Sequence, residues 1–242
     1  YRRAMFNRPY RTVDVEHGVS FDRLPVILER PGMQTRPWVL WLDYDKALNE
    51  ERREDLRWAI ENLPPNSIVL TTFAANGSPY GRPVNRPDRL RDLLGASVPD
   101  DLAREQCADE ELPLTLARYT QDWLSSAAAD VARPGGYIPC VSVPYRDSTP
   151  MVTVGGILPA IGAVPACRVA IQDPAWTGRY DGLLEAPHLT VKEVSALQSL
   201  LPAAEDITRT DVQALGFDLE DSQISVFGKY YALYPSFGQI IA

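Results

Sequence analysis

The chain has 242 residues, of which 45% are hydrophobic and 23% are charged, as expected for a globular protein with one large domain or one domain and a small appendage. Its net charge of -8 and pI near 4.9 argue against broad nucleic-acid binding, which needs a basic surface. The sequence has no apolar run of membrane-spanning length, so we expect no membrane association. Three widely spaced cysteines and two histidines show no metal-ligand spacing, so we expect no metal site and a reducing, cytoplasmic location.

The first half of the chain predicts a strand, a helix and a second strand. The apolar run of residues 38–42 stops at Asp43, which is typical of a strand buried on both faces of a parallel sheet. Residues 49–62 have the apolar spacing of a helix. Residues 67–73 are rich in β-branched side chains and predict the second buried strand. Together they predict a βαβ unit with two parallel strands, while residues 12–15 alternate and predict a separate short strand.

The middle of the chain predicts helices followed by a β-hairpin. Residues 78–87 form a loop rich in proline, glycine and arginine, and residues 88–132 carry helical patterns. Residues 137–143 and 151–158 are two β-rich runs joined by a turn, which predicts the hairpin. For residues 160–187 we expect a mixture of loop and strand.

Beyond residue 186 the sequence predicts a small module of helices. Thr190 followed by Glu193 has the spacing of a capping box and predicts a helix start. A second helix is expected over residues 210–215, ended by Gly216, and a third over residues 224–233.

The order of these elements resembles the second half of a class I S-adenosylmethionine-dependent methyltransferase. The segments YRRAMFNRPY (residues 1–10) and WLDYD (residues 41–45) also resemble a bacterial O-methyltransferase family, whose members are suspected of roles in defence against phage or foreign DNA. The likeness covers roughly residues 1–158 and continues more weakly beyond. It implies an α/β fold, with a Rossmann-like three-layer sheet and a terminal antiparallel hairpin in residues 1–160, and a helical C-terminal module packed on it in residues 161–242.

The sequence departs from this resemblance in one motif. Class I methyltransferases hold their cofactor with a glycine-rich turn after the first strand, and this chain has no G-x-G turn between a strand and a helix. The chain begins with Tyr1, so we expect either that the first βαβ unit, of roughly 30 residues or more, lies outside this sequence, or that the protein no longer binds the cofactor.

Asp43 and Asp45 are the candidate catalytic residues, and Tyr44 between them is a candidate for substrate binding. In open parallel sheets, ligands bind just past the carboxyl ends of the strands, where these residues are expected. Two residues apart in an extended chain, the two carboxylates would share one side, and one could accept a proton from a substrate. The alternative is that an acid at this position caps the following helix.

Asn76, Arg82 and Arg86 are further candidates for substrate binding. Asn76 follows the second strand and would reach the same crevice, although Asn76-Gly77 also fits an ordinary turn. Together with Arg89, the two arginines could grip a phosphate or an acidic substrate, or they could pair with nearby acids.

Three functions are compatible with these features. The resemblance implies a methyltransferase that uses S-adenosylmethionine on an unknown acceptor, with a possible link to bacterial defence. The missing glycine-rich turn favours a non-catalytic scaffold that binds a protein partner through the helical module and residues 78–90. A metal-dependent nuclease or nucleotide-processing enzyme that uses Asp43 and Asp45 is the third alternative.

Overall fold

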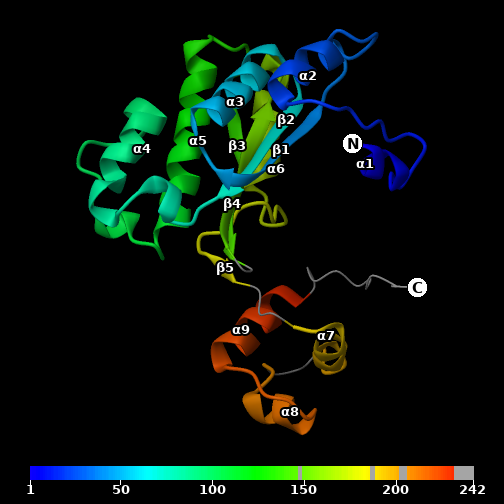
Figure 1. Ribbon diagram of the computed structural model, residues 1–242, viewed down its shortest axis with the longest axis vertical. Helices are drawn as coiled ribbons and strands as arrows, with labels where there is room; N and C mark the ends of the chain where they lie inside the picture. The colour runs from blue at the N-terminus through cyan, green and yellow to red at the C-terminus, as the bar shows by residue number, and fades with distance from the viewer. Residues whose placement is uncertain (147–148, 186–188, 202–205, 232–242) are drawn as a thin grey trace.

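The computed structural model describes residues 1–146, 149–185, 189–201 and 206–231. It is a mixed α/β structure in which all described strands precede residue 186 (Figure 1). In those four ranges, no helix has the length and apolar character needed to cross a membrane.

One sheet contains the five described strands in the order β1-β2-β4-β3-β5. These strands are β1 (Val39–Ala47), β2 (Ser67–Ala74), β3 (Ile138–Arg146), β4 (Pro150–Leu158) and β5 (Leu184–Glu185). β1 and β2 are parallel, whereas β4 runs antiparallel to both β2 and β3. The predicted α/β class, the parallel strand pair and the hairpin are therefore confirmed.

The parallel strands are joined by α3 (Glu50–Asn62), as the sequence predicts. Asn49 caps this helix, since its side chain accepts a hydrogen bond from the Arg52 backbone N–H at 3.0 Å. Leu56, Ala59 and Ile60 recur at helical spacing and are fully buried. The cap at Asn49 and the apolar face of residues 56–60 both favour a helix here, so the connection between β1 and β2 is short and regular.

Helices cover one face of the sheet and enclose the main apolar core. α5 (Leu112–Asp130) packs on β3 and β4, and α4 (Arg86–Leu94) lies beside it (Figure 1). Phe73, Leu116 and Val152 are fully buried between the layers. Short 3-10 helices connect these elements at Ser78–Tyr80, Pro83–Asn85, Gly95–Ser97, Glu105–Cys107 and Ile161–Ala163.

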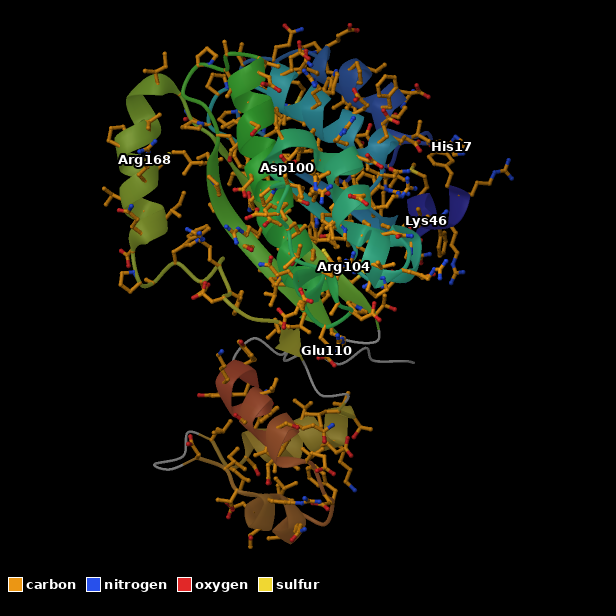
Figure 2. All side chains as sticks on the ribbon, turned by 90° about the vertical axis from the view of Figure 1, so that its left-hand side faces the viewer. His17, Lys46, Asp100, Arg104, Glu110 and Arg168 are labelled. Atoms are coloured by element: carbon orange, nitrogen blue, oxygen red, sulfur yellow. The ribbon has the colours of Figure 1, made fainter. Side chains whose placement is uncertain are left out.

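The other face of the sheet is thinly covered. α6 (Val164–Gln172), which contains Arg168, lies on that side, and none of its residues is buried (Figure 2). On β1, Val39 is 73% exposed and Trp41 is 59% exposed. The prediction that residues 38–42 are buried on both faces is therefore wrong, because the face of β1 that carries Val39 and Trp41 is left largely uncovered. The helix α6 was also missed, since loop and strand were expected there.

The N-terminal segment contains α1 (Arg2–Phe6) and α2 (Ser20–Leu28). The strand predicted over residues 12–15 is wrong, because those residues form a turn and irregular backbone. Val13 and Val15 are half-buried and alternate with exposed neighbours. The alternation reflects local burial, but none of the described strands pairs with this backbone.

The C-terminal helices have an apolar core of their own. They are α7 (Val191–Gln198), α8 (Arg209–Ala214) and α9 (Asp221–Tyr230), and their buried residues are Leu197, Val212, Ile224 and Phe227. The predicted capping box of Thr190 and Glu193 is confirmed, and Gly216 follows α8 with φ 92°. The last predicted residues of the third helix, 232–233, lie outside the described residues. The division at residue 160 stays a prediction.

Candidate functional site

A cleft of about 660 Å³ lies at the carboxyl ends of β1 and β2. The end of β1, the start of α3, the turn after β2 and the helix α4 all contribute to its lining. Among the polar lining residues are Asp45, Lys46, Asn76, Arg89 and Asp92. Parallel strands place their carboxyl ends side by side, so this is the position at which an α/β sheet is expected to bind a ligand.

An irregularity in β1 separates the two candidate aspartates. Asp43 pairs with Thr72 of β2 and Ala47 pairs with Ala74, so β1 contains two more residues than β2 between these pairs. The sequence suggested that the strand stops at Asp43. In the structure β1 continues past both acids to Ala47. Such bulges redirect side chains next to functional sites. Here Asp45 lines the cleft, whereas Asp43 is exposed and does not.

Tyr80 joins the two strand ends beneath the cleft. Its hydroxyl accepts a hydrogen bond from the Leu48 backbone N–H at 3.0 Å and donates one to the Ala74 carbonyl at 3.2 Å. Burial raises the pKa of the Tyr80 hydroxyl well above its usual value, so the group stays protonated and can keep donating. Tyr80 thus fixes the end of β1 against the end of β2.

Four cationic side chains line the cleft, and two of them are engaged by the protein. Arg52 donates to the Ala47 carbonyl at 2.5 Å, and Arg53 donates to the Leu93 carbonyl at 2.5 Å. Lys46 and Arg89 have no hydrogen-bond or ion-pair partner in the described part of the chain. These two cations are therefore the ones available to a ligand.

The turn after β2 carries Asn76 and is fixed by Arg86. Arg86 is only 3% exposed, and its guanidinium donates to the Gly81 carbonyl at 2.9 Å, the Cys107 carbonyl at 2.7 Å and the Asp109 carboxylate at 2.6 Å. A Cβ atom at Gly77 would lie 2.0 Å from Arg86 Nη2. The arginine therefore packs directly against the turn and holds it from behind.

Of the site residues in the sequence prediction, Asp45 and Asn76 both line the cleft. Arg82 is exposed and outside the cleft lining, and the Tyr44 hydroxyl donates to Asp55 on α3. Of the three arginines that the sequence suggested for binding an anion, Arg89 lines the cleft. Sequence reasoning gave no site role to Lys46 or Tyr80, or to Arg52, Arg53 and Asp92, and no sequence signal marks Tyr80.

The described residues do not form a cradle for S-adenosylmethionine. That cofactor needs a glycine-rich turn after a strand, where the backbone can approach it closely. The turn from β1 to α3 has no glycine, and the space beside Gly77 is filled by Arg86. Gly155 and Gly156 lie inside β4. We therefore assign no cofactor contact to these residues.

The fold and the cleft define an α/β protein with a candidate site at the carboxyl ends of two parallel strands. The chain belongs to the family described as "Putative O-methyltransferase", whose family model matches residues 1–242. This confirms the resemblance to a methyltransferase-like family that the sequence suggested. No curated protein and no solved structure matches the chain.

Proposed function

We propose that this protein is an S-adenosylmethionine-dependent O-methyltransferase whose acceptor binds in the cleft at the carboxyl ends of β1 and β2. The observation that carries the proposal is the meeting of Asp45 and Asn76 in a cleft of about 660 Å³ at the carboxyl ends of parallel strands. Membership of the O-methyltransferase family supports an oxygen atom as the acceptor and S-adenosylmethionine as the methyl donor.

The cleft residues suggest how an acceptor hydroxyl is handled. The Asp45 carboxylate accepts the hydroxyl proton, and the Asn76 amide hydrogen-bonds to the acceptor and orients it. Lys46 and Arg89 supply positive charge that stabilises the oxygen as it loses its proton. Most of the rate comes from holding the acceptor oxygen in the reactive orientation.

The sheet order supports a Rossmann-like relationship to class I methyltransferases. The hairpin inserts β4 antiparallel beside the parallel strand β2, which is the arrangement that the resemblance implies. In this proposal α6 belongs to the third layer, opposite α3 and α5.

Methyl transfer from radiolabelled S-adenosylmethionine to a panel of hydroxyl compounds tests the proposal. We expect Asp45→Asn to lower kcat by a factor of roughly 10² to 10⁴, the usual contribution of a positioned base. Asp43→Asn is the matched control, because Asp43 is exposed on the same strand and outside the cleft. Equal losses in both variants, or no loss in Asp45→Asn, contradict the role given to Asp45.

A non-catalytic scaffold is the second candidate, and the missing cofactor cradle favours it. Such a protein binds a partner protein through the helical module and residues 78–90. Calorimetry separates the methyltransferase from the scaffold, since the scaffold gives no heat on titration with S-adenosylmethionine.

No specific observation favours the nuclease alternative. Among the described residues, there is no group of three or more His, Cys, Asp or Glu side chains that could hold a metal ion. The link to defence and the cytoplasmic location stay predictions.

A further inference from the structure

The irregular part of β1 carries the cleft residues Asp45 and Lys46 but has no regular strand pairing. Register with β2 is present up to Asp43 and again at Ala47, and residues 44–46 between them have no partner in the ladder. Side-chain contacts must therefore hold this segment in place. The nature of those contacts decides how accurately Asp45 is presented to the cleft.

Tyr44 makes the contact that crosses from this segment to α3. Its hydroxyl donates to Asp55 Oδ2 at 2.7 Å, and Ser20 Oγ of α2 donates to the same oxygen at 2.5 Å. Asp55 is only 4% exposed. A hydrogen bond to a buried charged group is stronger than one between neutral groups. Burial and the adjacent Asp55 carboxylate raise the pKa of Tyr44, so the hydroxyl remains a donor.

Arg52 of α3 also contacts the irregular segment of β1. Its guanidinium lies 5.2 Å from the centre of the Tyr44 ring and donates to the carbonyl of Ala47 at 2.5 Å. The guanidinium therefore contacts the Tyr44 ring in a cation–π arrangement, and Ala47, the residue after Lys46, is tied to α3 as well. Both ends of residues 44–47 are fixed to one helix.

We propose that Tyr44 is a positioning residue which, through Asp55, holds the irregular segment of β1 so that Asp45 and Lys46 line the cleft. This replaces the substrate contact that the sequence suggested for Tyr44. The inference rests on the proposed function for its catalytic consequence. Its structural part concerns only the order of residues 45 and 46 and can be measured separately.

Backbone order parameters of the isotopically labelled 242-residue chain test the structural part. In the wild type we expect values near 0.85 at Asp45 and Lys46, and in Tyr44→Phe we expect values below about 0.6. Trp41 and Leu42, which pair regularly with β2, keep their values. Asp55→Asn is expected to lower the order parameters of residues 45 and 46 by less than Tyr44→Phe does. The asparagine keeps an oxygen that can accept the Tyr44 hydrogen bond, but the negative charge is lost. Asp55→Asn also serves as the test variant if Tyr44→Phe does not fold.

Tyr137→Phe is the matched control. The Tyr137 hydroxyl donates to Gln121 Oε1 at 2.7 Å, and the residue does not line the cleft. The control loses an equivalent tyrosine hydrogen bond and leaves the order at residues 45 and 46 unchanged. Unchanged order in Tyr44→Phe, or equal loosening of Trp41 and Leu42, overturns the inference.

Kinetics then test the catalytic part. Tyr44→Phe lowers kcat by about tenfold and leaves KM for S-adenosylmethionine unchanged, because Asp45 is then presented less accurately to the acceptor and the methyl donor is bound elsewhere; tenfold corresponds to about 1.4 kcal/mol of barrier. Equal changes in kcat for Tyr44→Phe and Tyr137→Phe overturn this part. If the wild type transfers no methyl group, the proposed function fails, and the order parameters still decide the positioning role.

Discussion

At the residue scale, the contact between Arg86 and Gly77 determines the shape of the turn that presents Asn76. All three nitrogen atoms of the Arg86 guanidinium donate to protein oxygens, so the arginine cannot move away without breaking hydrogen bonds. Glycine is needed at position 77 for this close approach, not for its backbone angle.

Gly77→Ala is therefore expected to destabilise the protein. The added Cβ would lie 2.0 Å from Arg86 Nη2 and 2.2 Å from Asp109 Oδ1, which forces the ion pair apart. We expect the free energy of unfolding, measured with urea, to fall by about 1–3 kcal/mol. Gly162→Ala is the control, since nothing lies within 4 Å of a Cβ there. An equal effect in both variants contradicts the proposed clash.

Only some of the site residues could be predicted from the sequence. Asp45 and Asn76 were found because both follow apolar runs in the sequence, and the ends of parallel strands meet. The exclusion of Asp43 from the cleft depends on the two extra residues in β1, which alternation along the chain cannot show. The burial of Arg86 depends on Cys107 and Asp109, which lie 21 and 23 residues further along the chain.

At the element scale, helix-capping signals predicted structure reliably, whereas features that depend on packing between distant segments could not be predicted. The capping box of Thr190 and Glu193 predicted a helix start because both partners lie within one helical turn. The helix α6 was missed because it is apolar on more than one side. Val164, Cys167 and Ile171 are half-buried at helical spacing, but Ala166, Val169 and Ala170 between them are exposed. The exposed face of β1 could not be predicted, because the segments that cover a strand are set by packing between distant parts of the chain.

An ion pair between α8 and the segment before α9 makes the stability of the helical module depend on pH. Arg209 Nη2 lies 2.7 Å from Asp218 Oδ2, and this hydrogen-bonded arginine lowers the pKa of Asp218 to about 2 from a usual 3.8. Because the folded-state pKa is depressed, the stabilisation is present above about pH 4 and is lost as the pH falls toward 2.

Amide hydrogen exchange of Val212 and Phe227, which are fully buried in the module, measures this effect. Their exchange protection should fall between pH 4 and pH 2 in the wild type and fall less in Asp218→Asn, which cannot titrate at this position. An identical pH profile in the two proteins would show that the pair does not stabilise the module.

At the scale of the whole molecule, two separate apolar cores predict two separable unfolding events. The core around Phe227 contains residues of α7, α8 and α9, and the larger core contains residues of the sheet and its helices. All five tryptophans lie before residue 177, so their fluorescence reports on the larger part alone.

Phe227→Ala is expected to destabilise the helical module by about 3–5 kcal/mol, the usual cost of emptying a fully buried aromatic site. Far-UV circular dichroism should then show an earlier loss of helix in urea, while the tryptophan fluorescence transition keeps its midpoint. Phe73→Ala, in the larger core, should shift the fluorescence transition instead. A common shift in both signals for Phe227→Ala would mean that the two cores unfold as one unit.

The outer edge of β1 also bears on how copies of this protein behave at high concentration. A strand edge without a neighbour offers backbone N–H and C=O groups to any other extended chain, and β1 has no strand on that side among the described residues. Asp43, Asp45 and Lys46 place exposed charge along this edge. Charged side chains on an edge strand oppose edge-to-edge association. The carboxylate proposed to act on the acceptor therefore also helps to protect the protein against aggregation.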